Sequence, residues 1–537
     1  MSAECYPITV LPHTTALYRD YLAMAEHDVV RGWYGSAPLG GEWMGAGSLL
    51  PVAMDRDALA DALEAECREY GAGAKALANV ERLRGGARAV VTGQQVGLLG
   101  GPLLTLLKAA TAVARAEEAT KATGVEHVPV FWLATEDHDL AEVDQMKLPT
   151  KTEIETLTLG LKVAAAVPVG GVRLGSGVEG LIDRVSELLA YAPITETLRE
   201  VYTAEATLGG AFARLMARVF AEQGLIVMAA AGRAFHALGA ATLRAAIERA
   251  EELEVALLAR TAELERQGYH AQVLVKAGAS LLFLLDDASG ERLVLKRTAE
   301  GEWKAGGKSY SAAELVGILD TAPERISPNA LLRPVFQDTI LPTAAYVGGP
   351  AEVAYFAQSA VLYERILGRI TPVLPRLTAT LVEPALAEVM AKHETVLVDV
   401  MTTPAELAQR LGARAMPIAG KRKLAAVGNA MDAELTGLTE YLGAMDASLG
   451  RAAEVSGSKM RYQMNRLRRL AATFELQKEA SLKKHADALA LNLFPDGHPQ
   501  ERVLGGVWFL ARYGEGLIAR LVDEAKTMCG GHAVVRL

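Results

Sequence analysis

The sequence predicts an α/β protein with a parallel-sheet core, α/β insertions and a C-terminal helical arm. Short apolar segments of strand length at 87–91, 128–134 and 224–229 alternate with helix-like sequence. The segment 128–134 (VPVFWLA) is apolar without alternation, as is typical of a parallel strand covered on both faces. From residue 383 to about residue 490 the sequence is almost entirely helical.

The first core elements follow each other closely. Residues 56–84 are rich in Ala, Leu, Glu and Arg, with apolar residues at steps of three and four, which predicts a helix. The strand at 87–91, a helix over 102–120 and the strand at 128–134 form a βαβ unit. Pro102 suits the first turn of that helix, because its missing N–H costs nothing there.

Two stretches differ from this pattern and are interpreted as insertions. The first, 151–206, combines a strand over 154–169 with a helix over 178–202. The second, 233–325, is helical up to residue 268 and then strand-like, with a hairpin around DDASGE at 286–291.

Two later parts return to the α/β pattern: a helix at 211–222 with the strand at 224–229, and a strand at 339–347 with the helix after it. The chain is therefore expected to fall into seven segments. They are the first part of the core (1–150), a connecting insertion (151–206), a core helix and strand (207–232), a second insertion (233–325), the last part of the core (326–382), a helical coiled-coil arm (383–492) and a C-terminal segment that packs back (493–537).

The arm has heptad-like spacing on both sides of a break at 456–458. The spaced apolar residues are Leu435, Leu438, Leu442, Met445, Leu449 and Ala452 before it, and Met460, Met464, Leu467, Ala471 and Phe474 after it. This spacing predicts an antiparallel helical hairpin or coiled coil. An ordinary packed helix pair and a dimerisation arm both remain open.

Composition excludes several classes of function. The 537 residues include 55 Lys and Arg and 64 Asp and Glu, so the net charge is −9 and no basic block marks a nucleic-acid binder. No uncharged apolar stretch reaches the ~20 residues needed to span a membrane. The N-terminus lacks the pattern of a signal peptide. The three cysteines fit neither a zinc site nor a disulfide framework, and so few cysteines suit a reducing, cytosolic setting.

Three polar, glycine-punctuated stretches are the strongest functional signal. They lie at 92–102, 136–139 and 337–352, each after an apolar segment. In an open parallel sheet, ligands bind just beyond the C-terminal ends of the strands. We therefore expect the three stretches to share one cleft.

The first stretch (TGQQVGLLGGP) has four glycines in eleven residues, which permit close approach of the backbone to a ligand. The helix after it presents free N–H groups and a partial positive charge, which favour an anion. Gln94 and Gln95 add donors, and Lys108 lies about two turns along that helix. The alternative is a structural turn that packs the helix against the sheet.

The second stretch, Glu136-Asp137-His138-Asp139, places four ionisable groups at the end of a buried strand. These groups can hold an amine, act as general base or bind a divalent ion. We favour polar substrate binding, with His138 as a proton carrier. Adjacent residues rarely all face one ion, and no metal is expected. Asp139 has a second interpretation as the cap of the next helix.

The third stretch contributes candidate ligand-binding side chains and a second glycine-fronted helix at Gly348-Gly349-Pro350. Glu352 also suits a first turn on electrostatic grounds alone, and Tyr346 also suits a core. Arg333 is either a carboxylate clamp or one half of a surface ion pair.

The motifs VVTGQQVGLLGGPLLTLLKA, VPVFWLATEDHD and RPVFQDTILPTAAYVGGPAEVAYFAQ together resemble, in order and content, the bacillithiol biosynthesis cysteine-adding enzymes (BshC). The late segment FPDGHPQERV resembles the C-terminal signature of that family. The resemblance covers essentially the whole chain.

The resemblance implies a Rossmann-like core related to class I aminoacyl-tRNA synthetases, and a C-terminal coiled coil that mediates dimerisation. It implies a cytoplasmic ligase that attaches L-cysteine to glucosaminyl-malate through an amide bond, the last step of bacillithiol synthesis. ATP or another adenine nucleotide is the implied cofactor. The sequence has no HIGH-type or KMSKS-type motif, so consumption of ATP is open, as is a second nucleotide site.

Carried over by motif, the expected site has three parts. The expected catalytic residues are Glu136, Asp137, His138 and Asp139. The expected cofactor-binding residues are Thr92, Gly93, Gln94, Gln95, Gly97, Gly100, Gly101, Lys108, Gly348 and Gly349. The expected substrate-binding residues are Gln337, Asp338, Thr343, Tyr346 and Glu352. Two other functions stay open: a non-catalytic scaffold that recruits another ligase, and a metal-dependent ligase or hydrolase that uses Asp137, His138 and Asp139.

Overall fold

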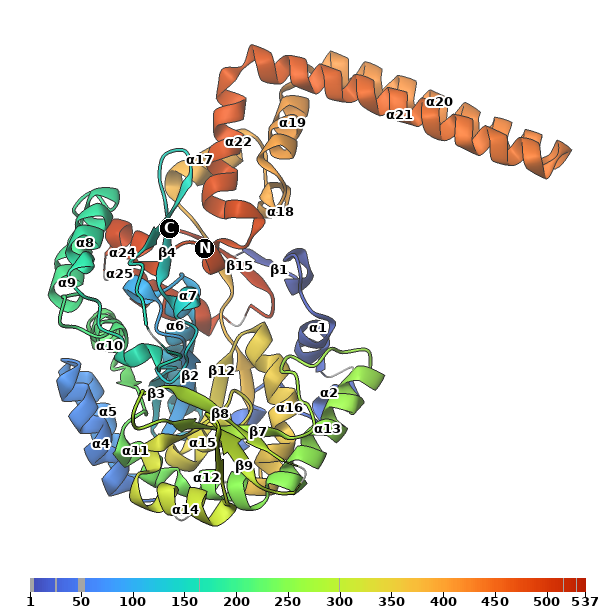
Figure 1. Ribbon diagram of the computed structural model, residues 1–537. Helices are drawn as coiled ribbons and strands as arrows, with labels where there is room; N and C mark the ends of the chain where they lie inside the picture. Colours follow the sequence, from blue (N-terminus) through green and yellow to red (C-terminus); the bar gives the residue numbers. More distant parts are fainter. Residues whose placement is uncertain are drawn as a thin grey trace. The chain divides into compact units, whose positions relative to one another are not determined.

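The computed structural model describes residues 4–24, 27–46, 54–163, 165–298, 300–514, 516–527 and 529–537 (Figure 1). The chain divides into two compact units. The first comprises residues 1–148, 155–379 and 501–533, and the second comprises 149–154, 380–500 and 534–537. The seven segment boundaries expected from the sequence remain a prediction.

A five-stranded parallel sheet forms the centre of the first unit, as predicted. Its strands are β2 (Arg88–Gln94), β3 (His127–Leu133), β6 (Ile226–Met228), β12 (Thr343–Gly348) and β13 (Val373–Pro375), in the order β13-β12-β2-β3-β6. The chain adds β3 and β6 on one side of β2, and later adds β12 and β13 on the other. The direction of winding therefore reverses between β2 and β12, where open α/β sheets bind ligands.

Helices cover both faces of this sheet. Val91 packs in one cluster with Leu63 of α4 (Arg56–Glu69) and Phe356 of α16 (Pro350–Leu367). Val90, the next residue of the same strand, packs on the opposite face against Ala112 of α6 (Leu104–Thr123). Successive side chains of a strand alternate between faces, so both faces of β2 are buried. This explains why the core strands show no alternation of apolar and polar residues.

The predicted βαβ unit is confirmed as β2, α6 and β3. The single helix predicted over 56–84 is instead two helices, α4 and α5 (Ala74–Arg84). Gly71, at φ +68°, lies between them in the left-handed region that favours glycine.

Four strands of the second insertion and β11, which follows it, form an antiparallel sheet with the order β10-β9-β8-β7-β11. Its strands are β7 (Ala279–Leu285), β8 (Arg292–Arg297), β9 (Trp303–Ala305), β10 (Lys308–Tyr310) and β11 (Ile326–Pro328). The hairpin predicted at 286–291 is the turn between β7 and β8.

The strand predicted over 154–169 is much shorter in the structure, where β5 covers Ile154–Thr158. The Asp144 carboxylate accepts hydrogen bonds from the Leu159 and Leu161 backbone N–H groups (3.2 and 2.7 Å) and turns the chain. Residue 164, within the predicted strand, lies outside the described residues.

The remaining elements before residue 380 are mostly helical. They are β1 (Glu4–Tyr6), α1 (Ala16–Leu22), α2 (Asp28–Arg31), α3 (Glu42–Ala46), α7 (Leu140–Val143), β4 (Gln145–Pro149), α8 (Gly177–Leu188), α9 (Ile194–Val201), α10 (Leu208–Val219), α11 (Arg233–Leu238), α12 (Ala240–Glu248), α13 (Ala250–Arg266), α14 (Ala312–Thr321) and α15 (Arg333–Ile340). The later elements outside the arm are β14 (Ala379–Val382), α23 (Gln500–Val503), α24 (Gly506–Tyr513), α25 (Gly516–Lys526) and β15 (His532–Arg536).

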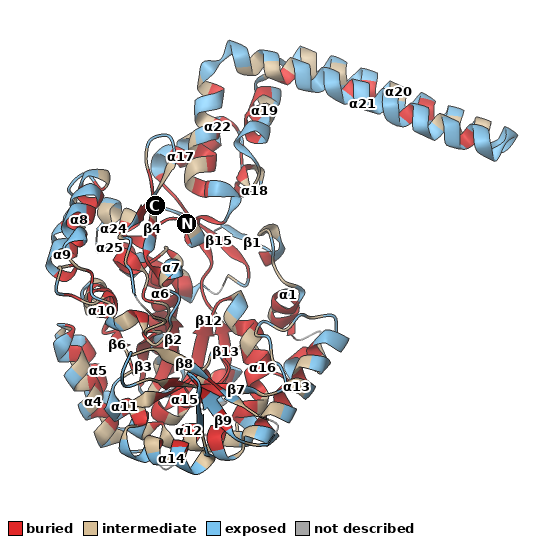
Figure 2. Cartoon of the chain, in the orientation of Figure 1, coloured by how far each residue is buried: buried red, intermediate tan, exposed pale blue. Residues whose placement is uncertain are grey.

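The second unit is largely helical, as predicted. It contains α17 (Pro384–Lys392), α18 (Leu397–Val400), α19 (Pro404–Ala415), α20 (Ile418–Met445), α21 (Ala447–Lys478) and α22 (Ala480–Leu493). The long helices α20 and α21 form an antiparallel hairpin, and Figure 2 shows that most of their surface is exposed.

The break expected at 456–458 is wrong, because the hairpin turns at Asp446. The Asp446 carboxylate accepts a hydrogen bond from the Ser448 N–H (2.7 Å) and caps α21. Gly457 instead lies inside α21 and faces Leu435 of α20, where a Cβ atom would lie 3.8 Å from the Leu435 side chain. The glycine serves close packing of the two helices.

Cys5 and Cys529 form a disulfide, with 5.9 Å between their Cα atoms. The spacing of the cysteines, interpreted as unsuited to a disulfide framework, did not indicate this bond. The partners are 524 residues apart in the sequence, so only the tertiary fold brings them together. Cys67 is buried and free. Within the described residues, the structure contains no helix with the length and apolar character required to cross a membrane.

Candidate active site

A cleft of about 750 Å³ lies at the C-terminal ends of β2, β3 and β12. All three predicted stretches contribute to it: Gly93 to Gln95, Glu136 to His138, and Gly349 to Glu352. The three stretches therefore share one cleft beyond the C-terminal ends of the strands, as predicted. The strand order adds that this cleft lies where the winding of the sheet reverses.

Ten of the nineteen predicted site residues line this cleft. They are Gly93, Gln94, Gln95, Lys108, Glu136, Asp137, His138, Tyr346, Gly349 and Glu352. The other nine do not line it. They are Thr92, Gly97, Gly100, Gly101, Asp139, Gln337, Asp338, Thr343 and Gly348.

The second half of the glycine-rich loop is covered by the C-terminal segment. The Gly506 N–H donates to the Gly101 carbonyl (3.1 Å), and the Leu103 N–H donates to the Leu504 carbonyl (2.8 Å). Gly100 and Gly101 have φ values of +87° and +72°, so the turn itself requires glycine there. Thr92 is also structural, because its hydroxyl donates to the Val347 carbonyl of the neighbouring strand (2.9 Å).

Lys108 and Glu352 form a nearly buried ion pair at the floor of the cleft, with 2.5 Å between Nζ and Oε2. Lys108 also donates to the Gly93 carbonyl (2.7 Å) and to Gln94 Oε1 (3.0 Å). Glu352 accepts hydrogen bonds from the Tyr346 hydroxyl (2.6 Å) and the Gly349 N–H (2.7 Å). Burial alone raises the pKa of Glu352, but the Lys108 ammonium and the Gly349 N–H outweigh it and lower this pKa overall.

These contacts change the interpretation of the predicted anion sites. The protein's own Glu352 carboxylate occupies the N-terminus of α16, and Lys108 is neutralised by the same carboxylate. Gly348 lies behind this contact, since a Cβ atom there would lie 3.1 Å from Glu352 Cβ. An added anion therefore has to bind to other positive groups.

Three arginines of the cleft have no acidic hydrogen-bond partner among the described residues: Arg292, Arg333 and Arg502. Arg292 donates to the Ser327 hydroxyl (3.0 Å) and to the Pro328 carbonyl (2.8 Å). Arg333 donates to Gln337 Oε1 and to the Tyr355 hydroxyl, both at 3.0 Å, and lies 5.5 Å from the centre of the Tyr346 ring. Of its two interpretations, the surface ion pair is wrong, and the carboxylate clamp stays a prediction. The exposed Arg502 makes no hydrogen bond or ion pair with the described residues.

Arg376 also lines the cleft but is held by an acid. Its guanidinium donates to both carboxylate oxygens of Glu501 (3.0 and 2.6 Å), and both side chains are almost fully buried. Arg376, Glu501 and Arg502 were not predicted as site residues. The only sequence signal for the last two was the family signature FPDGHPQERV, which contains them.

The acidic loop after β3 forms another part of the cleft. Asp137 accepts hydrogen bonds from Gln95 Nε2 (2.8 Å) and from the His138 N–H (2.7 Å), and its carbonyl accepts one from the Val169 N–H (2.7 Å). The Asp139 carboxylate instead accepts from the Glu142 N–H (3.2 Å) and caps α7. Of its two interpretations, the structure supports the helix cap.

His236 of α11 is a buried histidine next to the cleft that sequence reasoning missed. Its Nε2 lies 3.1 Å from Glu136 Oε1, and its side chain has no exposed surface. The two residues are 100 positions apart in the sequence, so no local motif signals the pair.

Gln337, Asp338 and Thr343 are buried behind the cleft wall and do not reach it. The Asp338 carboxylate accepts hydrogen bonds from Gln337 Nε2 (2.9 Å) and from the hydroxyls of Tyr363 (2.8 Å) and Thr371 (2.5 Å). These side chains satisfy each other, which is what buried polar groups require. Their expected role in substrate binding is corrected to a structural role.

The described residues contain no group of three or more His, Cys, Asp or Glu side chains placed to hold a metal ion. Asp137 and His138 face the cleft, but Asp139 caps α7. The three residues of the metal-dependent alternative therefore do not converge.

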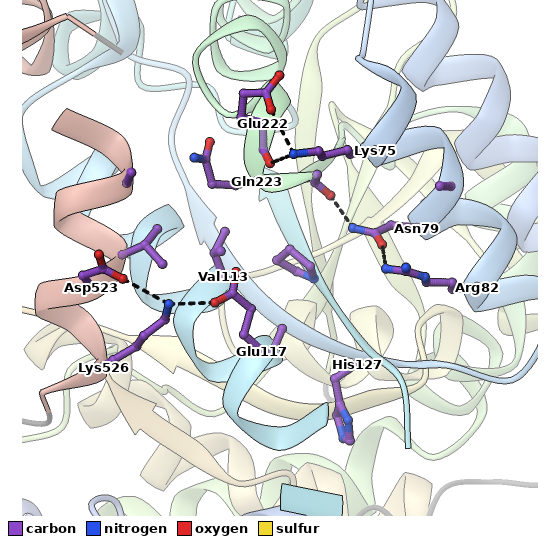
Figure 3. Close-up of a pocket in the computed structure, with 16 residues that line it drawn as sticks. Lys75, Asn79, Arg82, Val113, Glu117, His127, Glu222, Gln223, Asp523 and Lys526 are labelled. Carbon is purple, nitrogen blue, oxygen red and sulfur yellow. Dashed lines mark hydrogen bonds and ion pairs between the residues drawn. The ribbon is translucent and has the colours of Figure 1, made fainter. Parts of the chain in front are cut away.

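A second cavity, of about 480 Å³, lies near the N-terminal end of β3 and is shown in Figure 3. Both of its lysines are paired with carboxylates of the same cavity. Lys526 contacts Glu117 (2.9 Å) and Asp523 (3.1 Å), and Lys75 contacts the Glu222 carboxylate (2.9 Å). This cavity lies at the wrong edge of the sheet for the ligand site of an α/β fold.

Comparisons with known proteins decide the family. The family model described as "Bacillithiol biosynthesis BshC, N-terminal Rossmann-like domain" matches residues 1–377, and the model "Bacillithiol biosynthesis BshC, C-terminal coiled-coil domain" matches residues 379–537. The chain belongs to the BshC family. Its core is thus Rossmann-like, and its arm corresponds to the coiled-coil domain of BshC proteins.

Full-length BshC relatives agree with this assignment. A protein of Koribacter versatilis is 41% identical over 539 residues, and one of Solibacter usitatus is 35% identical over 544 residues; each alignment covers 100% of both chains. A protein of Geobacillus kaustophilus is 30% identical and covers 90% of each chain. All three are named "Putative cysteine ligase BshC".

Proposed function

We propose that this chain is a ligase that joins L-cysteine to glucosaminyl-malate through an amide bond, the last step of bacillithiol biosynthesis. The observation that carries the proposal is the meeting of three separated family motifs in one cleft at the switch point of the sheet. The names of the BshC relatives support the same reaction.

The charges of the cleft suit the two substrates. Glu136 and Asp137 are carboxylates at the end of β3, suited to an ammonium or amino group. Arg333 and Arg502 have no acidic hydrogen-bond partner among the described residues, and arginine is well suited to carboxylate and phosphate groups. The cleft therefore offers one region for an amine and another for an oxyanion.

Amide formation requires the attacking amine to lose a proton. His138 lines the cleft with a side chain that is 43% exposed, and its Nδ1 lies 3.8 Å from Asp137 Oδ1. We assign proton transfer to the His138 and Asp137 pair, because a positioned histidine is the most frequent general base. Asp139 is left out of this role, because it caps α7.

We also propose that an adenine nucleotide binds in the cleft. When bound, ATP would supply the activation of the carboxylate that amide formation in water requires. The residues that fit its phosphates are Arg333, Arg502 and the backbone of Gly93 to Gln95, which line the cleft. Lys108, expected for this role, is already paired with Glu352.

A single-turnover assay tests the ligase proposal. We expect purified protein with ATP, L-cysteine and glucosaminyl-malate to form the amide product with consumption of nucleotide. Asp137→Asn should lower the rate by about 10²–10⁴-fold, as expected for loss of a general acid–base group. The neighbouring change Asp139→Asn is the matched control and should retain activity.

Each other outcome of this assay excludes a part of the proposal. Product formed without consumption of nucleotide would rule out ATP as the activating cosubstrate. No product from the wild-type protein would contradict a ligase and favour the scaffold that recruits another enzyme. In cells that lack the gene, normal thiol levels restored by Asp137→Ala together with His138→Ala would favour the scaffold as well.

We propose that two copies of the chain associate through α20 and α21. The hairpin leaves large apolar side chains exposed that a folded monomer normally covers. They are Leu438, Tyr441, Met445, Leu449, Met460, Leu467, Leu470 and Phe474. A second copy of the chain presents the same apolar surface, so the two copies can pair through identical patches in an isologous contact.

We propose the cytoplasm as the location of the enzyme, where ATP and free L-cysteine are available together. Cell fractionation with an antibody to the native chain tests this proposal. Recovery outside the cytoplasmic fraction would contradict it.

A further inference from the structure

His236 is held rigidly beside the cleft. Its ring lies 5.2 Å from the ring of Phe336, which in turn lies edge-on to Trp132 of β3 at 6.3 Å. Gly239, directly after α11, has no room for a side chain, because a Cβ atom there would lie 2.1 Å from Phe336 Cε2. Phe336, which packs against the imidazole, is thus itself held in place by Trp132 and Gly239.

The hydrogen bonds of His236 determine where its protons are. Its Nδ1 lies 3.1 Å from the Pro323 carbonyl oxygen and 3.0 Å from that of Ile326. Carbonyl oxygens only accept hydrogen bonds, so Nδ1 must carry a proton. A neutral imidazole would then present a bare lone pair from Nε2 to the Glu136 carboxylate at 3.1 Å. This arrangement is repulsive, so Nε2 and Oε1 must share a further proton.

The surroundings decide which partner is charged. Burial lowers the pKa of His236, but the Glu136 carboxylate and the two carbonyl oxygens outweigh it and raise this pKa above its ordinary value. The Glu136 carboxylate and the two carbonyl oxygens thus favour the imidazolium form of His236. Asp137 and Arg292 are the other charged groups near Glu136.

Charged groups on the elements packed around α11 are already engaged with partners. Three arginines form ion pairs: Arg233 with Glu324, Arg325 with Asp287, and Arg244 with Asp320. The Glu66 carboxylate accepts a hydrogen bond from the Ala229 N–H. Arg333 donates hydrogen bonds to Gln337 and Tyr355. Glu136 is thus the acidic partner of His236.

We infer that His236 is a positioning residue that orients the Glu136 carboxylate toward the cleft, where it binds the amino group of a substrate. The inference rests on the proposed function and names the residue pair that receives the amine. Within the described residues, His236 is the ion-pair partner of Glu136, which makes no hydrogen bond of its own, and its side chain is 21% exposed. Its outer oxygen is therefore available to a ligand. Asp137, in contrast, already accepts from Gln95 and the His138 N–H.

Calorimetric binding of L-cysteine and of glucosaminyl-malate to the full-length protein tests this inference. We expect His236→Gln to weaken the binding of one of the two by roughly tenfold or more, since it removes the charge that orients the acceptor. Glu136→Gln should weaken the binding of the same substrate. The double variant should bind it little more weakly than either single variant. The matched control is His127→Gln, a buried histidine at the opposite end of β3.

The pH profile separates a positioning role from a merely structural one. The pKa of His236 is raised above its ordinary value, so kcat/KM of the wild type should fall as the pH rises through this pKa, and His236→Gln should lack this limb. Unchanged binding of both substrates together with an unchanged profile would overturn the inference. If His236→Gln does not fold, Glu136→Gln answers the binding question alone. Wild-type protein that binds both substrates but does not ligate them would refute the proposed function and leave this inference standing.

Discussion

Glu352 shows how one residue can determine the electrostatics of a site. Its carboxylate receives Lys108, the Tyr346 hydroxyl and the Gly349 N–H, which come from α6, β12 and the start of α16. The Lys108 and Glu352 side chains are only 5% and 14% exposed. Removing one partner of a buried ion pair leaves the other charged and uncompensated, which is the costly case.

We predict that Glu352→Gln lowers the free energy of unfolding at pH 7 by about 3–5 kcal/mol, because Lys108 loses its counter-charge. The pKa of Glu352 is lower in the folded protein, so the stabilisation is present above its unfolded value of about 4.3 and lost as pH falls through the folded pKa. Urea unfolding of both proteins at pH 7 and pH 4 measures the difference. The difference should be smaller at pH 4.

The control for this prediction is Glu155→Gln, which removes an ion pair with the part-exposed Arg184. Surface pairs contribute about 0–1 kcal/mol, so this variant should be nearly as stable as the wild type. If Glu352→Gln and Glu155→Gln lower the free energy of unfolding equally at pH 7, burial of the Lys108–Glu352 pair does not determine its contribution to stability.

Sequence reasoning located the cleft residues that directly follow the strands, such as Gln95, Asp137 and Glu352. It failed for Asp338, because a polar side chain that faces the protein interior looks the same in sequence as one that faces a ligand. It also missed His236, because the partner of that residue, Glu136, is distant in the sequence and no periodic pattern marks the contact.

Helix-scale features of the arm were predicted in part. The repeat of three and four identified two long helices, but it placed their turn at 456–458 instead of at Asp446. The small residues at 456–458 look like a break, whereas a glycine at a helix contact allows close approach without ending the helix. The cap formed by Asp446 is the signal that marks the turn.

We predict that charges on the exposed apolar face of the arm abolish dimerisation. Tyr441 and Phe474 are 66% and 63% exposed in the single chain, so Tyr441→Glu and Phe474→Glu should not disturb its fold. Light scattering should give twice the chain mass of 57.1 kDa for the wild type and the single-chain mass for the variants. Glu440→Lys, at an exposed polar position of α20, is the control and should remain dimeric.

Two outcomes would contradict association through the arm. A wild-type protein that is monomeric at micromolar concentration would exclude a stable dimer. Dimers that survive both substitutions would place the contact on another surface.

At the scale of the molecule, the order of the strands explains the position of the site. The chain winds from β2 to β6 in one direction and then returns to β12 on the other side of β2. The loops after β2 and β12 therefore diverge and leave a space between them. This position was predictable, because it depends only on the parallel strands and on which segments follow them.

Two features of the whole molecule could not be predicted in this way. The Cys5–Cys529 disulfide joins residues near opposite ends of the chain, and cysteine spacing contains no information about such a contact. The segment after residue 500 supplies Glu501 and Arg502 and covers the glycine-rich loop. These contacts depend on the final path of the chain.

The central claim is that the cleft formed by the ends of β2, β3 and β12 binds the substrates. A crystal structure of the full-length protein soaked with glucosaminyl-malate tests it most directly. We predict ligand density in contact with Glu136 and with Arg333 or Arg502. Density confined to another part of the molecule, such as the cavity near Lys75 and Lys526, would contradict the account.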